Sequence, residues 1–248
     1  MRTKSIFAAC AAFFAIAVSA SAQVPVVIHD PLRKAPEKNF TAGDEQLVKA
    51  KVLPKIKNRW SDNEDCDGRD LNVIGAADGS FTKKSAQQRA IVYEMCQTGN
   101  GFANNGIAIV ENGGIVAHFT TAGGWNLEVA RLADINKNGF DELAVETGGG
   151  MHQGYTGSSV SVLEISSASV RSLGTFLVFT NECENGGPEE YCDERYRITA
   201  KPRAAPVFSR QKYINKNGSD EKPKWTVSGK LHTAKPLASV IDKYTRVK

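Results

Sequence analysis

Short runs of hydrophobic residues, many of them alternating with polar ones, recur along most of the chain, and glycine or asparagine separates them. β-Branched residues are frequent in these runs, which favours strands over helices. Seven runs between residues 71 and 179 have this character: LNVIGA, RAIVYEMC, GIAIVE, GIVAHFT, ELAVETG, SVSVLEIS and SLGTFLVF. Three further strands are expected at 195–200, 206–213 and 225–231. No long helical pattern interrupts them, so the sequence predicts a mainly β fold with antiparallel sheets in one compact domain.

Local signals add a hairpin and a short helix to this pattern. Asn112-Gly113 between two apolar runs is a strong hairpin signal. Thr41, followed three residues later by Asp44, has the pattern of a capping box and predicts a short N-terminal helix. Pro54 is expected to kink or end that helix. Residues 85–95 fit a helix or a strand, and their apolar content favours the strand.

The first 22 residues have the organisation of an export signal. Arg2 and Lys4 precede an apolar run at 6–18, and the small residues at 20–22 suit a cleavage site. That run is too short to span a bilayer, and no later segment has the roughly 18 apolar residues that spanning needs. We therefore expect a secreted or periplasmic protein without a membrane span. The expected organisation is a signal peptide at 1–22, an extended arm at 23–40 and a single β-rich domain at 41–248.

Four cysteines lie beyond the expected signal peptide: Cys66, Cys96, Cys183 and Cys192. An even number of cysteines in an exported chain predicts disulfides, here two. Three pairings are possible, and the sequential one is favoured because a turn-rich loop separates the last two cysteines. A zinc site is the alternative, but the spacings are too long for one and no histidine lies nearby.

The formal net charge of +4 hides a strong asymmetry along the chain. Residues 60–194 hold 20 acidic and 7 basic residues, whereas residues 195–248 hold 14 basic and 3 acidic residues. A basic segment of this kind can bind nucleic acid or an anionic surface; alternatively, the basic ends wrap the acidic middle or the lysines are simply solvated. The basic residues are spread out with little aromatic interleaving, so we expect no nucleic-acid partner.

The stretch DINKNGFDE, residues 134–142, has the chemistry of a calcium loop. Calcium takes six to eight oxygen ligands, and a loop supplies them when alternate residues point inward and a glycine allows a sharp reversal. The oxygen-bearing residues stand at loop positions one, three, five, seven and nine, with Gly139 at six. The candidate metal ligands are Asp134, Asn136, Asn138, Phe140 through its carbonyl, and Glu142. The EF-hand pattern does not fit, because its twelfth position is Val145 here.

The segment ADINKNGFDELAVETGG resembles the loop of FG-GAP or VCBS-type repeats, a short calcium loop followed by an acidic pair and an apolar strand. The resemblance covers residues of about 131–165. It implies a structural calcium ion on the five candidate ligands and a relation to a β-propeller blade. The chain shows no second good copy of the motif, which favours a single-blade relative or a compact β domain over a full propeller.

Two interpretations of the loop remain open. In the first, calcium binds with the weak affinity of extracellular modules, on the order of 10⁻⁴–10⁻³ M, because the ligands carry only two formal negative charges. In the second, the stretch is an Asx-rich turn that needs no ion, since Asn and Asp side chains mimic backbone turns unaided.

Other candidate chemistry is sparse. Trp125 follows two glycines and is either a surface aromatic that contacts a ligand or a core residue, and His152 and Tyr155 in a glycine-rich connection could line a groove. We expect an exported, calcium-stabilised, disulfide-braced module that binds a protein or carbohydrate and has no evident catalytic residues. The alternative is a small secreted hydrolase with a polar cleft near His118 or His152, although no G-x-S-x-G motif is present.

Overall fold

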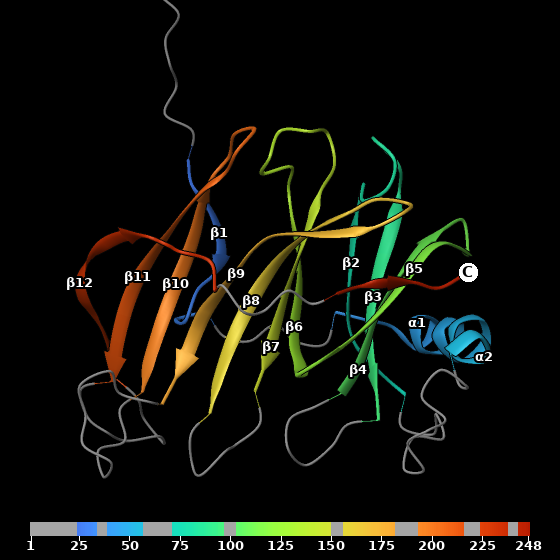
Figure 1. Cartoon of the computed structure of the whole chain (residues 1–248), viewed down its shortest axis with the longest axis horizontal. Coiled ribbons are helices and arrows are strands. Elements are labelled where there is room, and N and C mark those ends of the chain that lie inside the picture. Colours follow the sequence, from blue (N-terminus) through green and yellow to red (C-terminus); the bar gives the residue numbers. More distant parts are fainter. Residues whose placement is uncertain are drawn as a thin grey trace, which may run out of the picture.

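The computed structural model of the chain describes residues 24–33, 39–56, 71–96, 103–149, 156–181, 193–215, 224–237 and 243–248. Two antiparallel sheets stand next to each other, and a short helical segment covers the outer end of the smaller sheet (Figure 1). The predicted fold class is confirmed. Within the described residues, no helix combines the length and apolar character needed to cross a membrane.

The larger sheet has eight strands in the order β12-β11-β10-β9-β8-β7-β6, with β1 paired to β10. β9 pairs with β10 only at Glu194 and Arg195, and β1 pairs with the other end of that strand. Its strands are β1 (Val26–His29), β6 (Trp125–Leu132), β7 (Glu142–Gly148), β8 (Gly157–Ile165), β9 (Val170–Thr180), β10 (Glu194–Lys201), β11 (Val207–Asn215) and β12 (Trp225–Thr233).

The smaller sheet has five strands in the order β13-β5-β4-β3-β2. The predicted hairpin joins β4 to β5, and both of its turn residues, Asn112 and Gly113, have positive φ angles of 51° and 72°. The strands are β2 (Asn72–Gly79), β3 (Gln88–Met95), β4 (Ala103–Glu111), β5 (Gly114–Gly123) and β13 (Thr245–Arg246). Every run predicted as a strand forms one, while β1, β6 and β13 were not predicted.

The helical segment consists of α1 (Ala42–Leu47), a π-helical turn η1 (Val48–Val52) and α2 (Leu53–Ile56). The predicted capping box is present: Asp44 N donates to Thr41 Oγ1, and Thr41 N donates to the Asp44 carboxylate. Pro54 lacks an N–H and its ring crowds the carbonyl four residues earlier, so a widened turn directly before it is physically reasonable.

Three apolar clusters form the core, and β3 contributes to two of them. Ile91, Tyr93 and Met95 face the helical segment, where Val48, Val52 and Ile56 are fully buried. Ala90 and Val92 point to the opposite face and pack with residues of the larger sheet, including Leu143, Val145 and Leu163. The third cluster lies within the larger sheet around Phe176 and Ile198. Burial of both faces explains why β3 is almost continuously apolar.

The neighbouring edges of the two sheets, β2 and β6, contact each other without forming a hydrogen-bonded ladder. We call this junction the seam. Gly75 allows the close approach, because a Cβ atom there would lie 2.9 Å from Val129 Cβ. Asn39 bridges the two edges: its Oδ1 accepts from Ala76 N at 3.0 Å and its Nδ2 donates to Val129 O at 2.9 Å. The Asn39 side-chain amide thus satisfies one N–H of β2 and one carbonyl of β6, which a shared ladder would otherwise pair.

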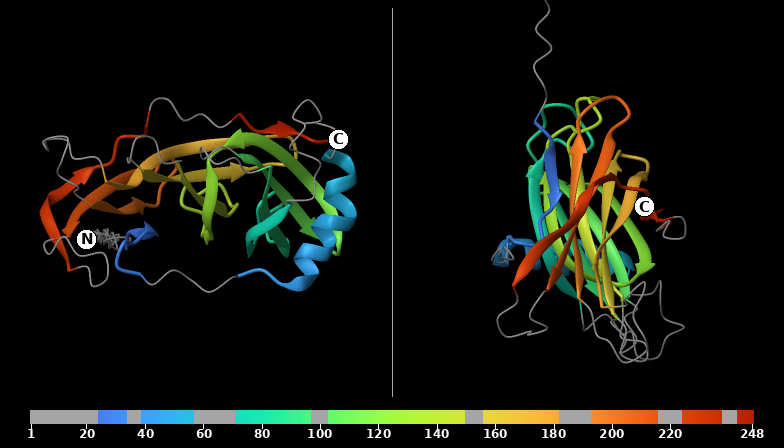
Figure 2. Two further views of the ribbon diagram at one scale, coloured as in Figure 1. Left: turned by 90° about the horizontal axis from the view of Figure 1, so that it is seen from below. Right: turned by 90° about the vertical axis from the view of Figure 1, so that its left-hand side faces the viewer.

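Both ends of the chain connect the two sheets. The N-terminal part contributes β1 to the larger sheet and then the helical segment against the smaller sheet, and the C-terminal part contributes β12 to the larger sheet and then β13 to the smaller one (Figure 2). Ile28 in β1 and Val247 after β13 are both buried. The arm predicted at 23–40 therefore includes a strand of the larger sheet.

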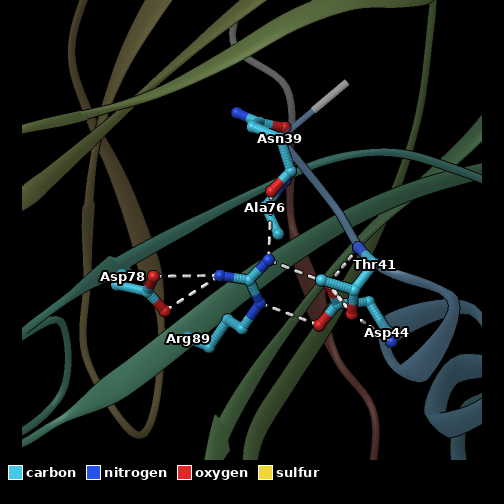
Figure 3. A network of polar contacts seen from close by, with 6 residues as sticks. All are labelled: Asn39, Thr41, Asp44, Ala76, Asp78 and Arg89. Carbon is cyan, nitrogen blue, oxygen red and sulfur yellow. Dashed lines mark hydrogen bonds and ion pairs between the residues drawn. The ribbon is translucent and has the colours of Figure 1, made fainter. Parts of the chain in front are cut away.

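Arg89 on β3 links the helical segment to the smaller sheet (Figure 3). Its Nε and Nη2 donate to the two carboxylate oxygens of Asp44 at 2.8 Å each, and Nη1 donates to Asp78 at 3.0 Å. Nη2 also donates to the carbonyl of Asn39. Burial alone would raise the pKa of Asp44, but the hydrogen bonds from Arg89 and Thr41 outweigh it and the pKa is lowered.

We predict that Asp44→Asn lowers the free energy of unfolding by about 2–3 kcal/mol at neutral pH, because it breaks a largely buried bidentate pair and half of the capping box. Since the folded-state pKa lies below the ordinary value of 3.8, this stabilisation is present above pH 3.8 and is lost as the pH falls below it. Urea unfolding of both proteins between pH 3 and 7 measures the difference.

Asp78→Asn is the matched control. Asp78 also contacts Arg89, but its side chain is 78% exposed, so we expect a loss of less than about 1 kcal/mol. Equal losses for the two variants would show that the Asp44 pair does not hold the helical segment.

Candidate functional site

The predicted calcium loop connects β6 to β7 in the larger sheet, at the seam. Gly139 has a φ angle of 89°, which confirms that this position needs a residue tolerant of left-handed backbone. Asp134 and Lys137 also have positive φ angles, of 29° and 60°. Two bonds to the Asp134 carboxylate and the bond from Lys137 N to Asp134 O hold the backbone in this conformation.

Side-chain oxygens gather on the inner side of the loop. Asp134 Oδ1 accepts from Asn138 N at 2.9 Å, and its Oδ2 accepts from Gly139 N at 3.1 Å. Asn136 Oδ1 accepts from Asn138 N, and Asn138 Oδ1 accepts from Phe140 N at 2.8 Å. These are the bonds of an Asx-rich turn, yet each of these oxygens retains a further lone pair that a cation could use.

Glu164 on β8 completes the loop from outside and was not predicted as a site residue. The amide nitrogens of Asn136 and Asn138 both donate to Glu164 Oε2. Its other oxygen accepts from Arg171 at 3.0 Å. By holding both amide nitrogens, Glu164 leaves both amide oxygens directed into the loop, which is how an outer carboxylate orients metal ligands.

Glu142 is a buried carboxylate whose hydrogen bonding is incomplete. It is fully buried; its Oε2 accepts from Ile135 N at 2.8 Å, and its Oε1 has no partner among the described residues. Glu164 lies directly opposite on the neighbouring strand, and although Arg171 pairs with Glu164, the two carboxylates form an unfavourable like-charge pair. Burial is the main cause that raises the pKa of Glu142 to about 7, and the nearby carboxylates add to it.

The residues present fit a hard cation. Asp134, Asn136, Asn138 and Glu142 all belong to this one loop, with Phe140 between the last two, and their role as ligands stays a prediction. Only two of these are acidic, and no group of three or more His, Cys, Asp or Glu residues is placed to hold a metal within the described part of the chain. Such a site therefore depends on amide and carbonyl oxygens, which suits calcium better than zinc.

Asp141, at loop position eight, points away from the loop to the seam. Its Oδ2 accepts from Ser80 N at 2.8 Å, and its N donates to Ser80 O at 3.0 Å. Arg131 lies 3.1 Å from the same carboxylate oxygen. Successive acidic residues of the loop therefore have different roles: Glu142 faces the loop interior, and Asp141 ties the loop to the turn between β2 and β3.

A second candidate region is a cavity of about 310 Å³ near the start of β6 and the ends of β7 and β9. Trp125 lines it, half-buried, with Leu127 and Phe179 as further apolar neighbours, and we call it the Trp125 cavity. Arg195 also lines it, and its guanidinium stacks over the rings of Phe179 and Trp225 at 5.5 and 4.5 Å. His152 and Tyr155, predicted to line a groove, lie outside the described residues.

Among the residues that the structure describes, the polar side chains of this cavity are not arranged as a catalytic triad. Glu146 stands in the middle: Ser158 Oγ donates to its Oε1 at 2.8 Å, and His29 Nδ1 lies 3.2 Å from its Oε2. Burial would raise the pKa of Glu146, but the bonds from His29 and Ser158 outweigh it and lower the pKa. In a triad the serine bonds to the histidine, whereas here both bond to the acid.

His118 lies in β5 and is only 2% exposed. Its Nε2 shares a hydrogen bond of 2.6 Å with the hydroxyl of the buried Tyr93. A residue so enclosed has a structural role in the smaller sheet, and its position gives no support to a catalytic cleft around it.

Cys96, at the end of β3, is disulfide-bonded. The other predicted disulfide cysteines, Cys66, Cys183 and Cys192, lie outside the described residues, so the pairing stays a prediction. No protein-family model, no curated protein and no solved structure matches the chain.

We predict that Glu142→Gln stabilises the protein by roughly 1–3 kcal/mol near pH 8 in the presence of a chelator, because the amide keeps the bond from Ile135 and removes a buried charge. Burial raises the pKa of Glu142 from 4.5 to about 7. Wild type therefore loses stability as the pH rises through this range, because the folded state holds the proton more tightly than the unfolded state does. Thermal unfolding at pH 5 and pH 8 measures the effect, and the variant's advantage should vanish at pH 5. A variant less stable than wild type at pH 8 would contradict this account.

Proposed function

We propose that the protein is an exported, non-catalytic β module whose β6–β7 loop binds a structural calcium ion and whose cysteines form bracing disulfides. The observation that carries the calcium proposal is the buried Glu142 Oε1, which has no partner among the described residues. A buried carboxylate oxygen without a partner is costly, and a cation beside it removes that cost. The resemblance of the loop to FG-GAP and VCBS-type repeats is in keeping with this.

Asp134, Asn136, Asn138, the Phe140 carbonyl and Glu142 would hold the ion. Calcium would supply positive charge between Glu142 and the other carboxylates of the site, and it would cross-link the backbone reversal that joins β6 to β7. Because Asp141 ties the same loop to Ser80, an ion there would also stabilise the seam between the sheets. We therefore assign the ion a stabilising role and no chemical step.

The binding role is supported by the cavities that open near the seam and by the absence of a nucleophile–base pair in the described part of the Trp125 cavity. The partner class is an extracellular or periplasmic protein or carbohydrate. Two observations weigh against the hydrolase alternative. Ser158 and His29 both bond to Glu146, and His118 is buried.

We expect about 10 mM calcium to stabilise the chelator-treated protein by about 1–3 kcal/mol, as expected for a Kd on the order of 10⁻⁴–10⁻³ M. For a chain of this size the corresponding rise in Tm is roughly 3–10 °C. Differential scanning calorimetry with calcium, magnesium or chelator measures it, and an unchanged Tm would refute the calcium site.

Glu142→Gln should abolish the calcium response, because its amide nitrogen would face the ion in place of the free carboxylate oxygen. Asp30→Asn serves as the control: this carboxylate pairs with Arg197 at 3.1 Å outside the loop, and the variant should retain the full response. Loss of the response in both variants would indicate a non-specific effect of ionic strength.

For the cysteines we expect two disulfides, Cys66–Cys96 and Cys183–Cys192, in the protein recovered after export. Proteolytic digestion without reductant followed by mass spectrometry identifies the linked peptides. Cys96→Ser should cost about 2–5 kcal/mol of stability, the usual range for a native disulfide. A linked peptide that joins Cys96 to Cys183 or Cys192 would disprove the sequential pairing.

A further inference from the structure

A cleft of about 520 Å³ lies at the seam, between β2 and β6 and beside the helical segment. We call it the seam cleft. It does not include the calcium loop, and none of its lining residues was predicted as a site residue. Its lining combines three asparagines and three glutamates with apolar side chains; among them are Asn39, Asn126, Glu45, Glu94, Glu128 and Leu127.

Glu94 on β3 is the central polar group of the seam cleft. Its side chain lines the cleft although the residue is only 6% exposed. The carboxylate accepts one hydrogen bond, from Asn126 N at 3.1 Å, and no other hydrogen bond or ion pair joins it to a described residue. Burial raises the pKa of Glu94 accordingly. A buried carboxylate with spare acceptor capacity, beside an open cleft, is a ready partner for a cationic donor.

The charges around the seam cleft also favour a cation. Glu45, Glu94 and Glu128 line it, against a single lysine, Lys49. Arg33 pairs with Glu128 from outside the lining, and its side chain is half exposed. Negative charge is therefore in surplus, which disfavours anionic ligands such as uronic acids or phosphates.

Asn126 supplies the complementary donor. It is 8% exposed; its Oδ1 accepts from Thr147 Oγ1 at 3.3 Å, and its Nδ2 has no partner among the described residues. A ligand that satisfies Glu94 and Asn126 together needs a positively charged donor next to a neutral acceptor. An ammonium group beside a hydroxyl oxygen provides this pair.

A local irregularity of β6 exposes one of the side chains that line the seam cleft. A β-bulge between Asn126 and Glu128 places Leu127 outward, where it is 53% exposed and lines both the seam cleft and the Trp125 cavity. Bulges that re-aim a side chain are frequent beside binding sites. Asn39, bonded to both sheets, holds the edges of the cleft at a fixed separation.

We propose that the seam cleft binds an amino sugar, with the sugar ammonium on Glu94 and a neighbouring hydroxyl on Asn126. The amide and carboxylate side chains suit a ring rich in hydroxyls, and Leu127 offers an apolar surface to its C–H face. The volume accommodates one or two sugar rings. This inference rests on the proposed binding role and adds the class of ligand to it.

Calorimetric titration with a trimer of β-1,4-linked glucosamine at neutral pH tests the proposal. We expect binding that weakens at least about tenfold in Glu94→Gln, which keeps an acceptor for Asn126 N but removes the charge. Glu111→Gln, a half-buried carboxylate of the same sheet outside the cleft, should bind as wild type does. The N-acetylated trimer, which lacks the ammonium groups, should bind at least about tenfold more weakly than the glucosamine trimer.

Lys49→Glu provides a test that does not depend on changing a buried group. Lys49 is exposed, and reversing its charge should strengthen binding of the glucosamine trimer several-fold. Unchanged or weaker binding in this variant would overturn the proposal.

The remaining outcomes separate this inference from the proposed function. No binding of the glucosamine trimer overturns the seam-cleft proposal, as does tighter binding of trialanine, which would assign the cleft to peptide amino termini. Binding that is indifferent to Glu94→Gln places the sugar elsewhere, so the module would bind carbohydrate while the seam-cleft proposal fails. The change in Tm on adding calcium is measured separately, so it tests the calcium site whatever the sugar titrations show.

Discussion

The fold depends on how two sheets meet edge to edge at the seam without sharing a ladder. Unpaired backbone groups at a buried edge are costly, so side chains have to satisfy them. Asn39 does so for Ala76 and Val129, and Asp141 does so for Ser80. Glu94 serves the nitrogen of Asn126 in the same way. The apolar cluster shared by both sheets buries side chains from each of them, and these polar contacts satisfy backbone groups that no ladder pairs.

Both candidate sites follow from this junction. The calcium loop borders the seam because Asp141 ties it to the turn between β2 and β3, and the next residue, Glu142, is then directed into the loop interior. The seam cleft lies between the edges of β2 and β6, where the bulge at Leu127 interrupts β6. Polar groups that stabilise a junction between sheets can thus also provide ligand contacts, since burial keeps them desolvated and oriented.

Sequence patterns predicted the strands well where one face is apolar and the turns carry glycine or asparagine. They predicted the Thr41 cap and the Asn112-Gly113 hairpin because both motifs are local. β6 was not predicted, because the bulge between Asn126 and Glu128 interrupts the alternation of buried and exposed residues along WNLEVARL. β1 and β13 are too short to have a pattern of their own and form only through pairing with β10 and β5.

By itself, the sequence determined the fold class, the helix cap, the hairpin and the oxygen-rich loop with its glycine, because each depends on residues within about ten positions of one another. Only the tertiary structure revealed Glu164 behind the loop amides, the unpartnered oxygen of Glu142 and the pairing of Glu94 with Asn126. These features join strands that are far apart in the chain. Burial and hydrogen-bond satisfaction are properties of the packed molecule, so no local pattern could have indicated them.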